Sequence, residues 1–206
     1  MPEGDTIHSA ARRVGAALVG QPIVSIETPQ ERHALDRWPE RLDGRAVRAV
    51  DARGEAAMTN NELALTYLGL GSLDEAARHV STARSELEGV HDEFRLAHIA
   101  DSEARIALAR GDDEGAARLA AEAVAFAESS HNDKALVDAL LTVARAARRQ
   151  GDRLAAIAAL ERAAGVAADS PPARLRQVLT EWSEIAAEAG DHAAAYDLTR
   201  RALALR

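Results

Sequence analysis

The sequence predicts a mainly α-helical protein, an array of four helical hairpins with about eight helices that follows a small α+β segment. Alanine, the residue with the strongest helix propensity, fills 48 of the 206 positions. No proline interrupts the chain between Pro39 and Pro171. Four glycines recur at intervals of 40, 40 and 39 residues, which indicates a repeated unit: Gly71, Gly111, Gly151 and Gly190.

A change of composition near residue 54 divides the chain into two expected domains, residues 1–54 and 55–206. The first part contains four of the six prolines and equal numbers of acidic and basic residues, eight of each. The second part contains 25 acids and 17 bases, so it carries the whole net charge of −8. We therefore expect a short mixed segment followed by a helical-repeat domain.

The N-terminal segment has the pattern of one helix and two short strands. Residues 6–18 place their apolar side chains on one helical stripe, and the Gly-Gln-Pro sequence at 20–22 ends that helix. Residues 22–27 and 45–52 are short β-branched runs, which predict two strands. The polar segment 28–43 contains two prolines and is expected to be a loop.

The first six residues, Met-Pro-Glu-Gly-Asp-Thr, resemble the start of the formamidopyrimidine-DNA glycosylase and endonuclease VIII family of base-excision repair enzymes. The resemblance continues through residues 7–20 and 45–54, about a quarter of the chain. It implies that Pro2, once Met1 is removed, attacks the sugar C1′ with its secondary amine and forms a Schiff base. It also implies that Glu3 acts as acid and base. An N-terminal amine titrates near ~8, so part of it is neutral and nucleophilic at neutral pH.

Several parts of that family's machinery have no counterpart in this sequence. Glu55 stands where the family has a lysine after the Arg-Gly pair, and the helix–two-turn–helix module is missing. The family's zinc finger requires cysteines, and the sequence has none. We therefore expect a truncated glycosylase start with little or no base excision. A DNA glycosylase with associated AP lyase activity is the alternative interpretation.

Each repeat is expected to consist of two helices joined by a tight turn at its glycine. Glycine takes the left-handed conformation after one helix ends, and the next residue caps the following helix. The expected caps are Ser72, Asp112, Asp152 and Asp191. Ser72 with Glu75 also fits the capping-box pattern.

Small residues keep a fixed distance from each turn glycine. They stand seven before it (Ala64, Ala104, Ala144, Ser183), five after it (Ala76, Ala116, Ala156, Ala195) and twelve after it (Ala83, Ala123, Ala163, Ala202). Small side chains let two helices approach closely. This pattern, over residues 57–206, resembles the tetratricopeptide repeat (TPR), which implies stacked hairpins that bind a protein. The period exceeds the usual ~34 residues and is similar to that of repeat arrays attached to bacterial transcriptional regulators.

The first helices of stacked hairpins are expected to line a groove. Groove positions fall six residues before the glycines, at Leu65, Arg105, Arg145 and Glu184. Together with Arg148 and Arg149, they predict a local basic patch that binds an acidic peptide or a carboxylate. The alternative is a solvated face, in which Asp101 pairs with Arg105 and the last two arginines serve the end of their helix.

Composition argues against several other classes of function. We expect no metal and no cofactor, because His91 and His98 lack a third ligand and the sequence has no phosphate-binding loop. No apolar segment is long enough to span a membrane and no signal-peptide pattern is present, so a cytoplasmic location is expected. The net charge of −8 argues against non-specific DNA binding.

The sequence therefore favours a helical-repeat module for protein–protein interaction, fused to a partial glycosylase N-terminus. The expected partner is a protein or an acidic peptide, and damaged DNA is a partner only if the N-terminal segment is functional. The sensor domain of a transcriptional regulator is a further alternative.

Overall fold

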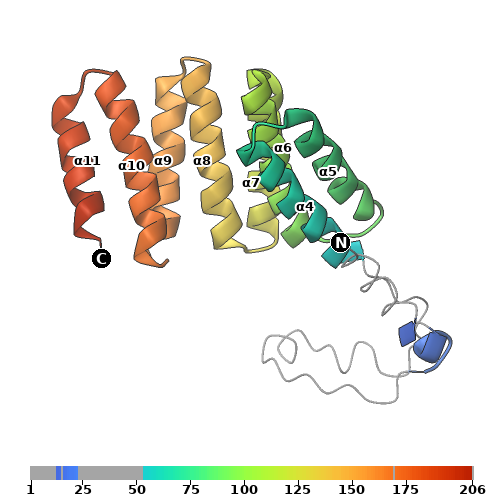
Figure 1. The fold of residues 1–206 in the computed structure, drawn as a ribbon. Coiled ribbons are helices and arrows are strands. Elements are labelled where there is room, and N and C mark those ends of the chain that lie inside the picture. The colour runs from blue at the N-terminus through green and yellow to red at the C-terminus, as the bar shows by residue number, and fades with distance from the viewer. Residues whose placement is uncertain (1–12, 15, 23–52, 169, 206) are drawn as a thin grey trace. The chain divides into compact units, whose positions relative to one another are not determined.

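The computed structural model describes residues 13–14, 16–22, 53–168 and 170–205, and the chain divides into two units, residues 1–56 and 57–206 (Figure 1). In the first unit, residues 13–14 and 16–18 are helical, and Gly20 turns the chain with a φ of 84°. The helix predicted at residues 6–18 thus ends where the sequence places its end. Apart from Pro22, the segments predicted as strands lie outside the described residues, as do the predicted loop and the catalytic candidates Pro2 and Glu3.

Eight helices fill the described part of residues 53–205 and pair as four hairpins (Figure 1). The first two hairpins are α4 (Arg53–Gly69) with α5 (Leu73–Glu86), and α6 (Glu93–Arg110) with α7 (Asp113–Ser129). The other two are α8 (Asp133–Arg149) with α9 (Arg153–Ala167), and α10 (Pro172–Glu188) with α11 (His192–Ala204). The predicted helical-hairpin array is confirmed.

The four turn glycines occupy the left-handed region, with φ between 74° and 82°. This conformation lets the backbone reverse after the first helix of each hairpin, and glycine adopts it without steric strain. The aspartates that follow cap the second helices as expected. Asp112, for example, accepts a hydrogen bond from the backbone N–H of Gly115 at 2.9 Å.

The capping box expected at Ser72 and Glu75 is wrong. Ser72 occupies the N-cap position of α5, but its side chain accepts no capping hydrogen bond. Glu75 instead forms an ion pair with Arg78 at 3.2 Å. Because the side chain of Arg78 is one turn further along the same helix, it competes for the carboxylate that a capping box would direct back to the N-cap.

Alanine forms much of the core. Ten of the twelve small positions predicted beside the turns are buried, and the two exceptions, Ser183 and Ala195, are half-buried in the last hairpin. Alanines at these positions leave no side chain to hold the helices apart, so their backbones approach closely. Larger apolar side chains fill the remaining space: Ile99, Leu141, Leu160 and Leu179.

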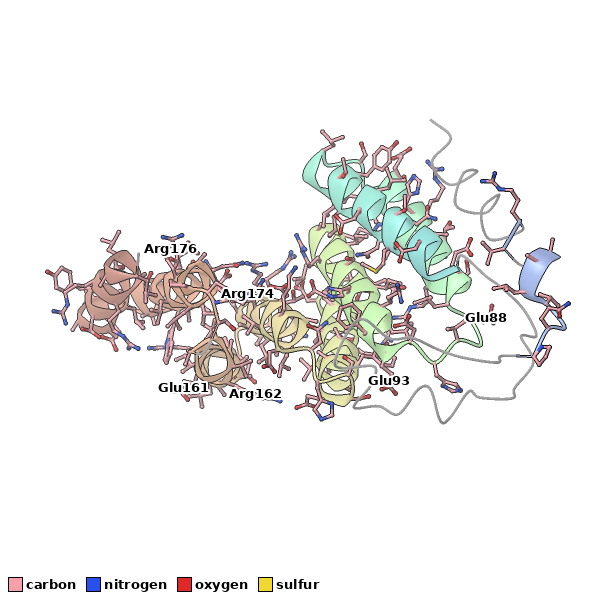
Figure 2. All side chains as sticks on the ribbon, turned by 90° about the horizontal axis from the view of Figure 1, so that it is seen from below. Glu88, Glu93, Glu161, Arg162, Arg174 and Arg176 are labelled. Atoms are coloured by element: carbon pink, nitrogen blue, oxygen red, sulfur yellow. The ribbon has the colours of Figure 1, made fainter. Side chains whose placement is uncertain are left out.

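The helices of the array form two layers. Within α6 to α11, α8 packs directly against both α6 and α10, whereas α7 and α9 meet through long side chains, as in the ion pair between Arg162 of α9 and Glu128 of α7. Figure 2 shows the two layers through Arg174 and Arg176 on α10 and Glu161 and Arg162 on α9. Since the first helices are the more closely spaced, α6, α8 and α10 form the inner face of the array.

Ion pairs join successive hairpins near the turns. Arg110, at the end of α6, pairs with Asp74 at the start of α5 at 2.6 Å. Arg149, near the end of α8, pairs with Asp113 at the start of α7 at 2.8 Å. The charges are reversed at the last junction, because α10 ends with an acid, Glu188, and α9 begins with a base, Arg153. Glu188 accepts a 2.8 Å hydrogen bond from Nε of Arg148, which lies on α8.

Candidate functional site

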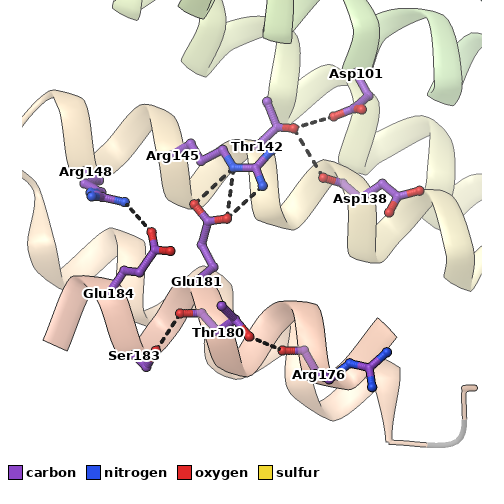
Figure 3. A network of polar contacts seen from close by, with 10 residues as sticks. All are labelled: Asp101, Asp138, Thr142, Arg145, Arg148, Arg176, Thr180, Glu181, Ser183 and Glu184. Atoms are coloured by element: carbon purple, nitrogen blue, oxygen red, sulfur yellow. Dashed lines mark hydrogen bonds and ion pairs between the residues drawn. The ribbon is translucent and has the colours of Figure 1, made fainter. Parts of the chain in front are cut away.

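A small polar cleft opens on the inner face, where α6, α8 and α10 meet. Its volume is 180 Å³. It is lined by Asp101, Arg105, Asp138, Leu141, Thr142, Arg145 and Gln177. Two of the predicted groove residues, Arg105 and Arg145, therefore lie in one cleft. Figure 3 shows the polar contacts around it, which come from all three helices.

Asp101 and Thr142 form the floor of the cleft. Thr142 Oγ1 donates a hydrogen bond of 2.6 Å to Asp101 Oδ1, and both side chains are buried (Figure 3). Burial raises the pKa of the Asp101 carboxyl, and the hydrogen bond from Thr142 and the charge of Arg105 oppose that rise. Asp101 therefore contributes a carboxyl that is shielded from water rather than a freely solvated anion.

Arg145 forms a forked pair with Glu181 of α10. Its Nε donates to both oxygens of Glu181 at 3.0 and 3.1 Å, and its Nη2 donates to Oε2 at 2.7 Å (Figure 3). These hydrogen bonds raise the pKa of Arg145 above its ordinary value, against the effect of burial. The expected ligand-binding role of Arg145 thus competes with a contact inside the protein. Nearby, Arg174 of α10 donates from Nη1 to Asp138 Oδ1 of α8 at 2.6 Å.

Arg105 occupies the same place in its hairpin as Arg145, but its surroundings differ. Its side chain is 39% exposed, and its closest acidic atom is Asp101 Oδ2 at 3.9 Å. That distance fits the predicted pair four residues apart, yet it is too long for a hydrogen bond. Among the described residues, no group accepts a hydrogen bond from the Arg105 guanidinium. Arg105 is therefore a cation with free donors in the cleft.

The other predicted groove residues do not form one patch. Arg148 pairs with Glu184 at 3.5 Å and hydrogen bonds to Glu188, so two of the predicted residues neutralise each other (Figure 3). The hydrogen bond to Glu188 raises the pKa of Arg148. Arg149 faces α6 and α7, where it donates to the backbone oxygen of Leu108 at 2.6 Å. Arg149 therefore donates to a backbone oxygen near the C-terminal end of a neighbouring helix, α6, rather than to one at the end of its own helix.

Two further candidates, Leu65 on α4 and His98 on α6, lie outside the cleft. Leu65 is half-buried on α4 and does not line the cleft. His98 lies in edge contact with Phe94, with ring centroids 5.5 Å apart, and within 3.3 Å of the Asn132 amide. Burial lowers the pKa of His98, and the charge of Lys134 lowers it further. The described residues contain no group of histidines and acids able to hold a metal ion.

Several cleft residues were not predicted, although the sequence carried a signal for them. Asp138 and Gln177 both stand thirteen residues before their turn glycines, as His98 does. Thr142 and Glu181 stand nine residues before theirs. The place of Asp101 is taken in α4 by Asn61, which is buried and whose Oδ1 has no hydrogen-bond partner among the described residues. Polar residues at these registers therefore mark the inner face.

Comparisons with known proteins identify the fold but no family. No family model matches the chain, and no curated protein matches it. Neither result supports the glycosylase resemblance of residues 1–54. In the described residues, none of the helices combines the length and the apolar character that a membrane span requires.

Solved structures with helical repeats resemble this chain. BtubC (BKLC) from P. vanneervenii is 17% identical with a TM-score of 0.67, over 75% of this chain and 64% of that one. A Podosopora anserina protein with nearly identical TPR-like repeats is 20% identical with a TM-score of 0.58, over 72% of this chain and 74% of that one. Aspartyl phosphate phosphatase F from Bacillus subtilis is 19% identical with a TM-score of 0.67, over 76% of this chain and 41% of that one. The fold is a TPR-like helical-repeat array.

Proposed function

We propose that the repeat array is a protein-interaction module that binds an acidic segment of a partner protein on its inner face. The observation that carries this proposal is Arg105, a half-exposed guanidinium without a hydrogen bond to any described residue. The neighbouring cations of the cleft, Arg145 and Arg174, are bound to Glu181 and Asp138. Arg105 is thus the group with donors to offer to a carboxylate, which it can bind through two parallel N–H groups.

The size of the cleft favours a side chain over a free small molecule. Small-molecule sites usually enclose roughly 300–1,000 Å³, whereas this cleft has a volume of 180 Å³. A glutamate or aspartate side chain of an extended peptide fits such a space, while the peptide backbone lies along the helices outside it. The hydroxyl of Thr142 and the amide of Gln177 provide neutral polar groups at the walls.

The test uses short soluble peptides with a fixed central Glu and mixed flanking residues, compared with the same library carrying a central Gln. Binding is measured by fluorescence anisotropy with the full chain. We expect the Glu library to bind better. Arg105→Gln is expected to weaken binding about tenfold or more, since a hydrogen bond to a charged group contributes ~1.5–3 kcal/mol.

Arg118→Gln is the matched control, because Arg118 is an exposed arginine on α7, in the other layer. It changes the net charge by the same amount without altering the cleft. Equal weakening by the two substitutions shows general charge attraction and contradicts the proposal. Equal binding of the Glu and Gln libraries contradicts it as well.

Chemistry at the N-terminus is a separate hypothesis, motivated by the Met-Pro-Glu-Gly-Asp-Thr sequence. It assigns DNA glycosylase and AP lyase activity to Pro2 and Glu3, and it requires nothing of the repeat array. The sensor domain of a transcriptional regulator is compatible with the same inner face, since it too binds through a groove. The trapping experiment in the Discussion separates the N-terminal hypothesis from binding on the inner face.

A further inference from the structure

Asp101 brings a second carboxyl to the cleft in which Arg105 is proposed to bind the partner's carboxylate. Both residues line the cleft, one helical turn apart on α6. Asp101 Oδ1 accepts the hydrogen bond from Thr142, whereas Oδ2 lies 3.9 Å from Arg105 Nη1. Among the described residues, none donates a hydrogen bond to Oδ2. This oxygen is therefore available to a ligand that Arg105 holds.

A carboxylate bound to Arg105 comes close to Asp101 Oδ2, because the same guanidinium lies beside both. Two carboxylates that share one small site repel each other when both are ionised. A proton on Oδ2 removes this repulsion and turns the oxygen into a donor that can bond to the ligand. The protonation of Asp101 thus decides whether the floor of the cleft repels the ligand or binds it.

The other charges around Asp101 on α8 and α10 are paired with one another. They form two ion pairs between these helices: Arg145 with Glu181, and Asp138 with Arg174. Arg105 is therefore the cation that an ionised Asp101 neutralises and that a protonated Asp101 leaves with its full charge. Further along the inner face, His98 of α6 is influenced by Lys134 of α8 and Glu62 of α4, and none of these three lines the cleft.

The surroundings of Asp101 already favour its protonated form. Burial raises the pKa of this carboxyl, and the charge of Asp138 raises it further, while the hydrogen bond from Thr142 and the charges of Arg105 and Arg145 lower it. An anion on Arg105 cancels the effect of that arginine and adds a charge of the same sign as the carboxylate. The bound protein therefore holds the proton to higher pH than the free protein does.

We propose that the acidic segment binds together with one proton from the solvent, which Asp101 holds on Oδ2 while Arg105 holds the carboxylate of the segment. This inference rests on the proposed function, because it concerns the same cleft and the same partner. Asp101 is then the residue that regulates the site. Binding is strong in mild acid, and the array releases its partner as pH rises.

The affinity of the full chain for peptides at a series of pH values tests the proposal. The probes are members of the Glu library with uncharged flanking residues and blocked termini. Their glutamate, with a pKa near ~4.3, stays ionised above about pH 5.5. We expect the affinity to fall by about tenfold or more as pH rises from the pKa of Asp101 in the free protein to its higher pKa in the complex, since one pKa unit corresponds to a factor of ten.

Asp101→Asn imitates the protonated carboxyl, because its oxygen accepts from Thr142 and its amide donates to the ligand. We expect this variant to bind the Glu peptides about tenfold or more tightly than wild type at the alkaline end of the series, without the fall. Glu161→Gln is the matched control. Glu161 is an exposed acid on α9, in the other layer, and its replacement changes the net charge by the same amount. This control is expected to follow wild type at every pH, and histidines titrate equally in both variants.

Isothermal titration calorimetry of wild type in buffers with different heats of ionisation measures the proton uptake itself and depends on no variant. We expect uptake within the pH window of the fall, and its loss in Asp101→Asn. Binding that requires Arg105 but takes up no proton at any pH overturns this inference and leaves the proposed function standing. Equal strengthening by Asp101→Asn and Glu161→Gln also overturns it. Absence of binding to the Glu peptides overturns both, and far-UV circular dichroism establishes that each variant is folded.

Discussion

Thr142 donates a hydrogen bond from Oγ1 to Asp101 Oδ1 at 2.6 Å and thereby joins α8 to α6 at an aspartate whose side chain is 11% exposed. The two residues are 41 positions apart, one repeat period plus one residue. A buried acceptor that loses its donor pays the full desolvation penalty, because no water replaces the lost partner. The cleft floor is therefore a point where one hydroxyl affects the packing of two hairpins.

Replacing this hydroxyl by a methyl group is expected to destabilise the array. Thr142→Val keeps the shape of the side chain and leaves Asp101 without its donor, so we expect a loss of ~1–3 kcal/mol in the free energy of unfolding. Thr82→Val is the control, since Thr82 is exposed and its hydroxyl bonds only to its own helix, at the Arg78 oxygen. Urea denaturation measures both, and equal effects would contradict the role given to Thr142.

The raised pKa of Asp101 predicts a pH-dependent contribution to stability. The folded protein holds this proton to higher pH than the unfolded chain, whose ordinary value is 3.8. Stability from this group is therefore lost as pH rises from that value through the raised pKa. Arg105 and Arg145 reduce the rise, and Asp138 increases it.

Asp101→Asn removes this titration and keeps an oxygen that accepts from Thr142. We expect the stability of the variant relative to wild type to increase as pH rises across that window, and then to level off. Urea denaturation at a series of pH values measures the difference. A difference that stays constant across the window would show that Asp101 ionises in the fold without cost.

The two arginines at equivalent places in α6 and α8 are expected to differ in their effect on stability. Arg145→Gln leaves Glu181, 13% exposed, without its three hydrogen bonds, and should destabilise by ~2 kcal/mol. Arg105→Gln breaks no hydrogen bond and should change stability by ~0.5 kcal/mol or less. Thermal or urea melts compare the two, and a larger loss for Arg105→Gln than for Arg145→Gln would reverse our assignment of roles.

Replacing glycine by alanine is expected to change stability in opposite directions at a turn and inside a helix. Gly111 has a φ of 82°, so Gly111→Ala is expected to destabilise by ~1–2 kcal/mol from the left-handed strain. Gly165 lies within helix α9 with no neighbour within 4 Å of an added Cβ. Gly165→Ala should therefore stabilise by up to ~1 kcal/mol. Melting temperatures that move in the same direction for both would contradict the turn assignment.

Chemistry at the N-terminus is tested by borohydride trapping on abasic-site DNA. A preparation without Met1 presents the secondary amine of Pro2, and we expect weak trapping on single-stranded DNA, at high protein concentration and low salt only. The missing grip on DNA lowers the effective concentration, and the acidic array repels the phosphates. Pro2→Ala should reduce trapping to the background given by Lys134 and other primary amines, the new N-terminal amine included. Undiminished trapping in Pro2→Ala would show that the N-terminal resemblance carries no chemistry.

The architecture of the array could be predicted because it depends on local rules. Gly111 with Asp112 specifies a turn whatever surrounds it, since the left-handed glycine and the capped helix are formed by adjacent residues. The buried alanines follow for the same reason, because their spacing from the glycine sets the face on which they lie.

The candidate site was only partly predictable, because pairing between hairpins depends on three-dimensional distances. Arg105 and Arg145 are indistinguishable by register, and only the position of Glu181 on α10 engages one of them. Arg149 was expected either to line the groove or to interact with the end of its own helix, but it donates to the Leu108 backbone oxygen in the adjacent hairpin. At Ser72 the side chain makes no capping hydrogen bond, and the Glu75 carboxylate, which a capping box would turn back to the N-cap, pairs with Arg78 instead.

The reversed charges at the last junction constrain how this array can have grown by gene duplication. At the first two junctions an arginine near the end of a first helix meets an aspartate at the start of the preceding second helix. A copy of the second hairpin placed beside the original would therefore meet an opposite charge at both of its junctions, whereas a tandem copy of the third hairpin would bring Arg149 beside Arg153. A copy of the fourth hairpin placed after the second would bring Glu188 beside Asp113, and the like charges would repel. Duplication of the second hairpin can therefore lengthen the array without a charge conflict, whereas the fourth hairpin does not fit after the second.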